Sequence, residues 1–271
     1  MKLDNITDFK KIEGRLKDSY KTLYLNPRKT EKELSITESK MGGAPNLAKI
    51  KEWPVCEYCN ANLNFILQLY KKDFPLFYFP EGENLFLLFR CPNPGCPDAF
   101  SEKHDHSMSW FYLNANDSSS EKPIHHPNQS DKEDWEKPIP ICSFNPQEKI
   151  DYPNSYEERV KLCGSIYDTF SDKYLEDEFI YNEFLERYPN WYGTKIGGYP
   201  SWTQNYYDFR CQCKENKRLL FQLSTCYGLR FPEDKTEFED HGISIGDAGN
   251  IYFFICDDCG EESIETYWDC E

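Results

Sequence analysis

One series of sequence motifs occurs twice in this chain of 271 residues. The segment KMGGAP (40–45) is followed by a tryptophan, a pair of cysteines and an apolar run that contains Gln68, and KIGGYP (195–200) is followed by the same series up to Gln222. Each glutamine lies nine residues after a cysteine, Cys59 in the first copy and Cys213 in the second. So many landmarks in one order are hard to attribute to chance, and the sequence therefore predicts two related halves. The loop residues expected to have a structural role are Gly42, Gly43, Pro45, Gly197, Gly198 and Pro200.

Short apolar and aromatic runs, bounded by Pro, Gly and Asn, predict β-strands in both halves. These runs are 63–70, 75–79, 85–91, 108–113, 218–225 and 250–256. Residues 6–25 place apolar side chains at helical spacing, and Ser155 with Glu158 forms a capping box that predicts helical structure from there, including 173–187. The predicted fold class is α+β, with mostly antiparallel sheets from two related halves, an N-terminal helix and a helical connector.

The chain is long enough to bury one large core, and we predict a single domain over 1–271. Its expected parts are an N-terminal helical segment (1–35), a first repeat (36–113), a polar loop with a helical connector (114–190) and a second repeat (191–271). The Ser- and Asp-rich residues 114–137 are expected to form a loop or a flexible insertion.

Eight of the 12 cysteines form two sets of two closely spaced pairs. The first set is Cys56, Cys59, Cys91 and Cys96, and the second is Cys211, Cys213, Cys256 and Cys259. Antiparallel pairing of the intervening apolar runs would bring both pairs of a set to one end of the sheet. Four thiolates there would hold a structural zinc ion and leave no open position for catalysis. The alternative is a group of reduced thiols that simply pack, and the C-x-C spacing of the second set is tighter than is usual at zinc sites.

Gln68 and Gln222 each place an amide inside an otherwise apolar strand. A buried amide needs hydrogen-bond partners, so we expect both side chains to bond the backbone of the nearby GG-x-P segment. Asp247, between two glycines, could act as a base, but Asp-Ala-Gly is more typical of a turn in which the carboxylate caps backbone N–H groups.

Two histidine pairs could bind a metal through imidazole nitrogens, but both lie in polar, loop-like sequence and are expected at the surface. They are His104 with His106, and His125 with His126. The remaining cysteines have no partner by spacing and are expected to be core or surface thiols. They are Cys142, Cys163, Cys226 and Cys270.

The charge balance bears on the class of partner. With 31 Lys and Arg against 47 Asp and Glu, the formal net charge is −16, which repels nucleic-acid phosphates and favours a basic protein partner. The charged N-terminal sequence is not a secretory signal, and no run of about 18 apolar residues occurs, so we expect a cytoplasmic protein without a membrane partner. The H-E-x-x-H and P-loop motifs do not occur, so neither metalloprotease nor NTPase chemistry is supported by motif.

The order and content of these motifs resemble the YwqG-like family (DUF1963) and, more distantly, the programmed cell death protein 2 family. The segments that carry the resemblance are SKMGGAPNL (39–47), WPVCEYC (53–59), LNFILQL (63–69), LFLLFRC (85–91), IGGYPSW (196–202), LLFQL (219–223) and GDAGNIYFFIC (246–256). They span about residues 39–259. The resemblance implies one sheet-rich domain of two related halves, and it supplies no catalytic residues.

The resemblance also implies three classes of function. The programmed cell death protein 2 relatives act as dedicated chaperones for a ribosomal protein, which favours a non-enzymatic protein-binding domain with a basic client. Some YwqG-like proteins are proposed to neutralise toxins, which gives the alternative of an immunity-type partner. The family has also been linked to RNA processing, which gives the alternative of an RNA-processing enzyme.

Overall fold

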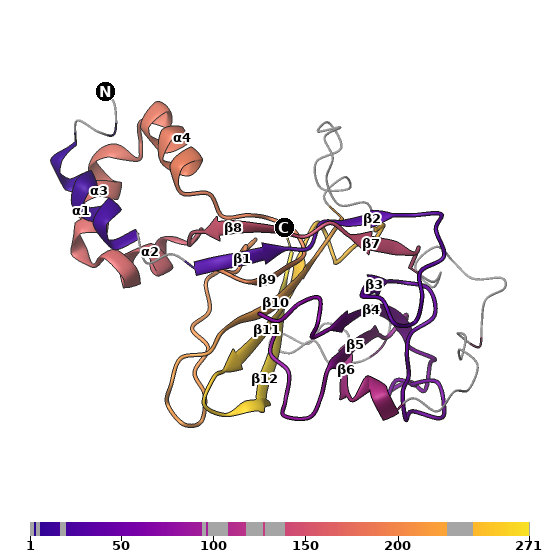
Figure 1. Ribbon diagram of the computed structural model, residues 1–271. Coiled ribbons are helices and arrows are strands. Elements are labelled where there is room, and N and C mark those ends of the chain that lie inside the picture. Colours follow the sequence, from indigo (N-terminus) through magenta and orange to yellow (C-terminus); the bar gives the residue numbers. More distant parts are fainter. Residues whose placement is uncertain are drawn as a thin grey trace.

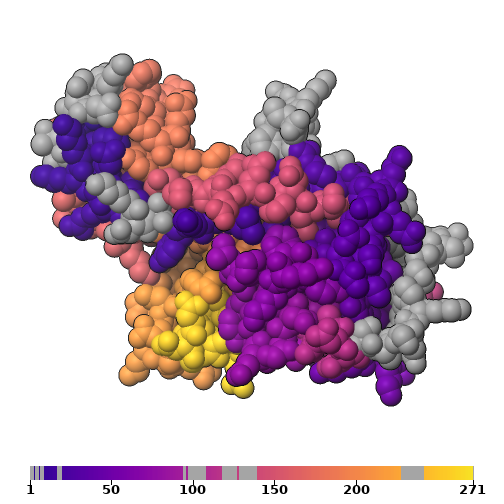
Figure 2. All heavy atoms as spheres, in the orientation of Figure 1, coloured from indigo at the N-terminus to yellow at the C-terminus, as the bar shows by residue number. Residues whose placement is uncertain are grey.

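Two antiparallel β-sheets and a group of helices make up the protein (Figure 1). The computed structural model describes residue 3 and residues 6–16, 20–93, 96, 108–117, 127, 139–226 and 241–270. The helices form a lobe that stands to one side of the sheets, at the upper left of the space-filling view (Figure 2). The predicted α+β class with mostly antiparallel sheets is confirmed.

The first sheet has the strand order β2-β7-β3-β4-β5-β6. Its long central strands are apolar on both faces, because both faces are covered by other side chains. The strand bounds are β2 Pro27–Lys29, β3 Lys40–Met41, β4 Asn64–Tyr70, β5 Leu85–Arg90, β6 Met108–Leu113 and β7 Cys142–Phe144.

The second sheet has the strand order β12-β11-β10-β9-β1-β8. Strands β10 and β11 are again almost entirely buried, whereas β12, at the sheet edge, has buried, partly exposed and exposed positions. The strand bounds are β1 Tyr20–Tyr24, β8 Gln147–Asp151, β9 Lys195–Gly197, β10 Arg218–Ser224, β11 Asn250–Cys256 and β12 Gly260–Asp269.

Two segments far apart in the chain cross together from one sheet to the other. Strand β1 is followed by β2, and β7 by β8, so that β1 pairs with β8 in one sheet while β2 pairs with β7 in the other. The pairing runs from Tyr20 opposite Asp151 to Lys29 opposite Cys142. This ribbon ties the two sheets together with main-chain hydrogen bonds.

The main hydrophobic core lies between the two sheets. It includes Ile66 of β4 and Phe86 of β5 from one sheet, and Phe221 of β10 and Phe253 of β11 from the other. Burying each such side chain contributes about 1.5–3 kcal/mol, so this layer is the largest source of stability in the fold. A second cluster, with Leu87 and other side chains, covers the outer face of the first sheet.

The helical lobe has its own core of aromatic side chains, in which Phe9, Phe170 and Phe184 are in ring contact. The capping box is confirmed, because the Ser155 hydroxyl accepts a hydrogen bond from the Glu158 N–H at the start of α2. The helix bounds are α1 Thr7–Leu16, α2 Tyr156–Cys163, α3 Ser165–Tyr174 and α4 Glu178–Arg187. None of the described helices has the length and apolar character needed to cross a membrane.

Several predicted elements are wrong. The predicted helix at 6–25 ends at Leu16, and 20–24 form β1, because β8 and β9 supply hydrogen-bond partners on both sides. Residues 75–79 form no strand; Phe77 and Phe79 are apolar because they fill the core. The helix predicted at 173–187 is divided, since α3 ends at Tyr174 and α4 starts at Glu178.

The predicted repeats, 36–113 and 191–271, each contain four strands of one sheet, β3–β6 and β9–β12. Each sheet is completed by two further strands from the segments predicted to be helical, namely β1 and β2 within 1–35 and β7 and β8 within 114–190. A common origin of the two halves stays a prediction. Most of the predicted loop at 114–137 lies outside the described residues, apart from a short 3-10 turn, Ala115–Asp117, and residue 127.

Candidate metal centres and the GG-x-P network

The first cysteine set converges at one end of the first sheet. Cys56 and Cys59 lie in a tight turn before β4, and Cys91 and Cys96 follow β5, so the pairing of β4 with β5 brings the two pairs together. The Sγ atoms of Cys56 and Cys96 are 3.7 Å apart, and those of Cys59 and Cys91 are 3.5 Å apart. All four sulfurs lie within 4.8 Å of one another.

The second set converges in the same way on the second sheet. Cys211 and Cys213 precede β10, while Cys256 and Cys259 lie at the tight connection between β11 and β12. The Cys213 and Cys256 sulfurs are 3.6 Å apart, and the four sulfurs again lie within 4.8 Å of one another. The tight C-x-C spacing therefore does not prevent convergence. Two of these side chains, Cys213 and Cys259, are exposed, whereas three of the first set are buried.

The sulfur spacing fits a tetrahedral metal site. Ligands about 2.3 Å from a zinc ion are about 3.8 Å from one another in a regular tetrahedron, close to the measured 3.5–3.7 Å. A disulfide would require about 2.05 Å between sulfurs, and all eight cysteines are free thiols. Because each set already supplies four sulfur donors, either centre could be closed around one ion.

Local backbone geometry prepares some of these thiols to bind metal as thiolates. A hydrogen bond from the Ala61 backbone lowers the pKa of the Cys59 thiol to about 7, and one from the Cys213 backbone lowers that of Cys211 to about 7. Burial raises the pKa of Cys91, and hydrogen bonding to Cys211 raises that of Cys259 to about 12. Because these pKa shifts are opposite, Cys59 loses its proton at lower pH than Cys91, and Cys211 loses its proton at lower pH than Cys259.

The residues after the first pairs of each set also match in conformation. Asn60 and Lys214, directly after Cys59 and Cys213, have φ values of +57° and +78°. Their N–H groups donate to the carbonyls of Cys56 and Cys211, 2.9 Å away in both cases. Both pairs thus sit in a tight turn that holds the two sulfurs on one side.

Both strand glutamines bond the backbone directly after the GG-x-P segments. Gln68 Oε1 accepts a hydrogen bond from the Asn46 N–H, and Gln222 Oε1 accepts one from the Ser201 N–H, both at 2.9 Å. Asn46 and Ser201 each directly follow the proline of the motif. The amide nitrogens donate to backbone carbonyls, those of Ile36 and Glu38 in the first half and that of Gly193 in the second.

The glycines of both motifs occupy positions closed to other residues. Gly42 and Gly198 have φ values of +62° and +78°, in the region that glycine prefers. A Cβ atom on Gly42 would meet the carbonyl oxygens of Ile139 and Pro140, and one on Gly198 would meet the Asp151 carboxylate. The glycines therefore allow the chain to turn at the end of the strand that begins with each motif's lysine, while it packs against the neighbouring chain.

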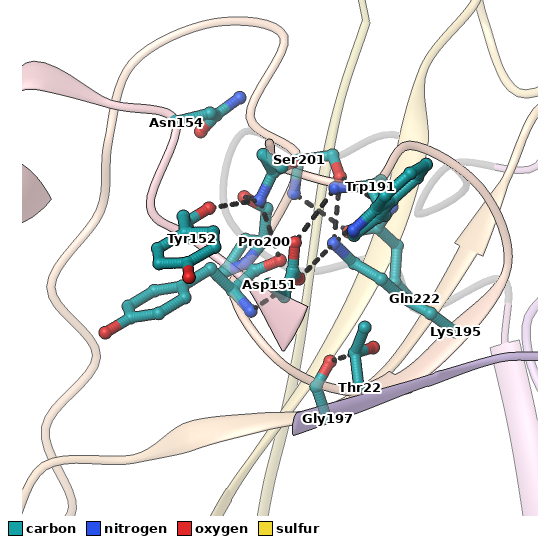
Figure 3. A network of polar contacts seen from close by, with 12 residues as sticks. Thr22, Asp151, Tyr152, Asn154, Trp191, Lys195, Gly197, Pro200, Ser201 and Gln222 are labelled. Carbon is teal, nitrogen blue, oxygen red and sulfur yellow. Dashed lines mark hydrogen bonds and ion pairs between the residues drawn. The ribbon is translucent and has the colours of Figure 1, made fainter. Parts of the chain in front are cut away.

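Sequence reasoning missed the buried ion pair of the second motif, which Figure 3 shows at close range. The Lys195 ammonium lies 2.7 Å from Asp151 Oδ2, both side chains are fully buried, and the same ammonium donates to the Trp191 carbonyl and the Ser201 hydroxyl. Asp151 also accepts the N–H groups of Trp191 and Tyr199. Burial lowers the pKa of Lys195, and Asp151 opposes that shift. A lysine in a strand was visible in the sequence, but the partner, 44 residues away, was not.

The first motif has a lysine at the corresponding place, and no described carboxylate forms an ion pair with it. Lys40, opposite Gln68 in the β3–β4 ladder, donates to the carbonyls of Leu34 and Ser35 at 3.0 Å. Burial lowers the pKa of Lys40. The two motifs therefore share a buried lysine and differ in how its charge is compensated.

Glu158, the acidic residue of the capping box at the start of α2, lies beside the Lys195 network. Burial raises the pKa of its carboxyl to about 7, while the hydrogen bond from the Ser155 hydroxyl and the charge of Lys195 oppose the shift. This carboxyl therefore changes its protonation state near neutral pH.

Within the part of the chain that the structure describes, the other sequence candidates form no further centre. Asp247 lies exposed in a turn before β11, as expected of Asp-Ala-Gly. Cys142, Cys163 and Cys226 are buried thiols, and Cys270 is partly buried. The four histidines at 104, 106, 125 and 126 lie outside the described residues.

Comparison with known proteins shows the family of the chain. No curated protein matches the chain. The family described as "Domain of unknown function (DUF1963)" matches residues 39–259, which contain both cysteine sets and both GG-x-P segments. This match covers most of the chain, and the protein therefore belongs to the DUF1963 family.

Proposed function

We propose that the protein is a non-catalytic protein-binding domain whose two sheets are each stabilised by one structural zinc ion. The observation that carries the proposal is the pair of four-cysteine centres, in each of which the four sulfurs lie within 4.8 Å of one another. An ion held by four thiolates has no open position for substrate or water, so its contribution is to folding.

Each ion would join loop segments that lie outside the paired strands. The first centre links the turn before β4 to the segment after β5, and the second links the turn before β10 to the β11–β12 connection. Zinc bound by Cys56, Cys59, Cys91 and Cys96, and by Cys211, Cys213, Cys256 and Cys259, would therefore close the corresponding end of each sheet.

The acidic charge favours a basic protein as the partner. A formal charge of −16 speeds association with a positively charged partner and disfavours nucleic acid. Together with the resemblance to the programmed cell death protein 2 family, this supports a chaperone-like role in the cytoplasm towards a basic client such as a ribosomal protein.

Native mass spectrometry of the purified chain tests the metal. We expect two zinc ions in the wild type, one in Cys56→Ser, one in Cys256→Ser and two in the control Cys142→Ser, whose buried thiol lies outside both sets. A chain purified without chelator that carries no zinc, or single variants that retain two ions, would contradict the assignment.

Affinity purification from the native cell, followed by mass spectrometry, tests the partner. Recovery of one basic protein in a defined ratio is expected. Recovery of a single toxin-like nuclease would instead support the immunity-type alternative. The absence of any stoichiometric protein partner would refute the proposed function.

A further inference from the structure

Strand β6 forms one edge of the first sheet. Among the described strands it pairs only with β5, from Leu85 opposite Leu113 to Arg90 opposite Met108. The other side of an edge strand presents backbone donors and acceptors that can pair with an added strand.

A groove of about 530 Å³ follows this edge. Residues Met108–Phe111 of β6 line its floor, the cysteine turn with Val55 and Tyr58 lines one wall, and Thr266 of β12 lines the other. In Figure 2 the purple surface of the first half borders the yellow surface of the C-terminal strand on the face shown. The groove therefore lies where the edge of one sheet meets the edge of the other.

Side chains of β6 alternate between the two walls. The Trp110 ring points between the sheets, with its centroid 5.5 Å from that of Phe253. The Phe111 ring lies on the outer face, 5.8 Å from Phe89, in the cluster that includes the cysteine turn. A strand added along β6 would send its own side chains alternately to these two sides, which is how edge-binding domains read a sequence.

The chemistry of the groove specifies the occupant. Val55 and Tyr58 are 49% and 50% exposed and offer apolar surface at the rim. Among the described residues of the lining, Glu57 is the one that carries a charge, and none is a Lys, Arg or His. Apolar side chains would fit between the sheets beside Trp110, while the stem of a Lys or Arg would lie over Tyr58 with its cation near Glu57.

We propose that β6 binds an extended segment of a partner protein, in which apolar residues alternate with Lys or Arg, as an added strand. The proposal rests on the proposed function as a protein-binding domain and names the surface that performs it. Main-chain pairing supplies affinity, while the groove walls and Glu57 select the sequence.

Fluorescence polarisation with a labelled ten-residue peptide of alternating Val and Lys tests this pairing. The matched peptides are one of alternating Val and Glu, and the Val-Lys peptide with its central amides N-methylated. We expect both to bind at least tenfold more weakly, because the first opposes Glu57 and the second cannot donate to an edge strand. Equal binding of the N-methylated peptide would overturn the proposal.

Variants and hydrogen exchange locate the site. Glu57→Lys and Tyr58→Ala should each weaken Val-Lys binding at least fivefold, while Glu186→Lys and Tyr181→Ala, at exposed residues of α4 that do not line the groove, should leave it unchanged. All four variants must keep the zinc content of the wild type, which excludes unfolding as the cause. The amides of Met108–Leu113 should exchange more slowly with peptide bound. Protection elsewhere, or unchanged affinity of the groove variants, would overturn the assignment.

Two outcomes separate this proposal from the proposed function. A native partner that Glu57→Lys and Tyr58→Ala still bind in full would refute the groove and leave the protein-binding function standing. Specific peptide binding at β6 without any native partner would support the groove and count against the function. A concentration-dependent dimer that Tyr58→Ala abolishes would identify a second copy as the occupant and refute the proposal.

Discussion

The first prediction concerns how much the buried ion pair of Lys195 and Asp151 contributes to the stability of the fold. Both side chains are fully buried, and the Nζ–Oδ2 distance is 2.7 Å. Lys195→Met removes the cation and leaves the carboxylate of Asp151 buried with only two backbone N–H donors, from Trp191 and Tyr199. Removing one member of a buried pair costs about 3–5 kcal/mol because an uncompensated charge remains. At about 2–4 °C per kcal/mol for a chain of this size, the melting temperature should fall by about 6–20 °C.

The first motif supplies a matched control. Lys40 occupies the corresponding strand position and bonds the carbonyls of Leu34 and Ser35. Lys40→Met therefore leaves two unpaired carbonyls and no buried anion, so we expect a smaller loss, about 1–3 kcal/mol. Comparing the two variants separates the cost of a buried charge that has lost its partner from the cost of lost hydrogen bonds.

A double-mutant cycle completes the experiment. Asp151→Asn keeps an oxygen acceptor for the Trp191 N–H but removes the carboxylate that is paired with Lys195. Combined with Lys195→Met, it removes both charges, so the double variant should be more stable than the sum of the single losses predicts by about 1–3 kcal/mol. Urea unfolding followed by circular dichroism measures all four free energies. A coupling energy near zero, or a loss for Lys195→Met no larger than for Lys40→Met, would refute the reasoning.

Three further predictions concern the same region. Gln222→Leu should lose about 1–3 kcal/mol in urea unfolding, because it leaves the Ser201 N–H without its acceptor; unchanged stability would refute the role of the amide. Gly198→Ala should lose at least about 1–2 kcal/mol from its φ of +78° alone, whereas Gly14→Ala, in the open on α1, should gain up to about 1 kcal/mol. For Glu158, with a folded-state pKa of about 7 against an ordinary 4.5, the raised value contributes stability below pH 4.5 that is lost as pH rises through 7. In thermal melts, the unfolding free energy of Glu158→Gln minus that of the wild type should be about 2–3 kcal/mol larger at pH 8 than at pH 5. A difference that is the same at both pH values would contradict the shifted pKa.

Local patterns in the sequence determined several elements correctly. The runs that became β4, β5, β6, β10 and β11 are apolar enough to form strands in any buried sheet, and the capping box fixed the start of α2 because its hydrogen bonds are local. The spacing of the cysteines, combined with antiparallel pairing, was enough to predict which thiols converge.

Other elements depended on partners distant in the chain. Residues 20–24 have helical spacing, yet they form β1 because β8 and β9 offer hydrogen bonds on both sides. Short, partly polar strands such as β8 carry too little periodicity to be recognised alone. The apolar residues at 75–79 fill the core without forming a strand, which hydrophobicity by itself does not reveal.

The sequence by itself therefore determined the motifs, the long strands and the two cysteine sets, because these depend on local composition and spacing. The tertiary structure decided the compensation of Lys195 by Asp151, the ribbon that joins the sheets and the groove along β6. Each of these arises where segments far apart in the chain meet, and the energy of a long-range contact is not encoded in either segment alone.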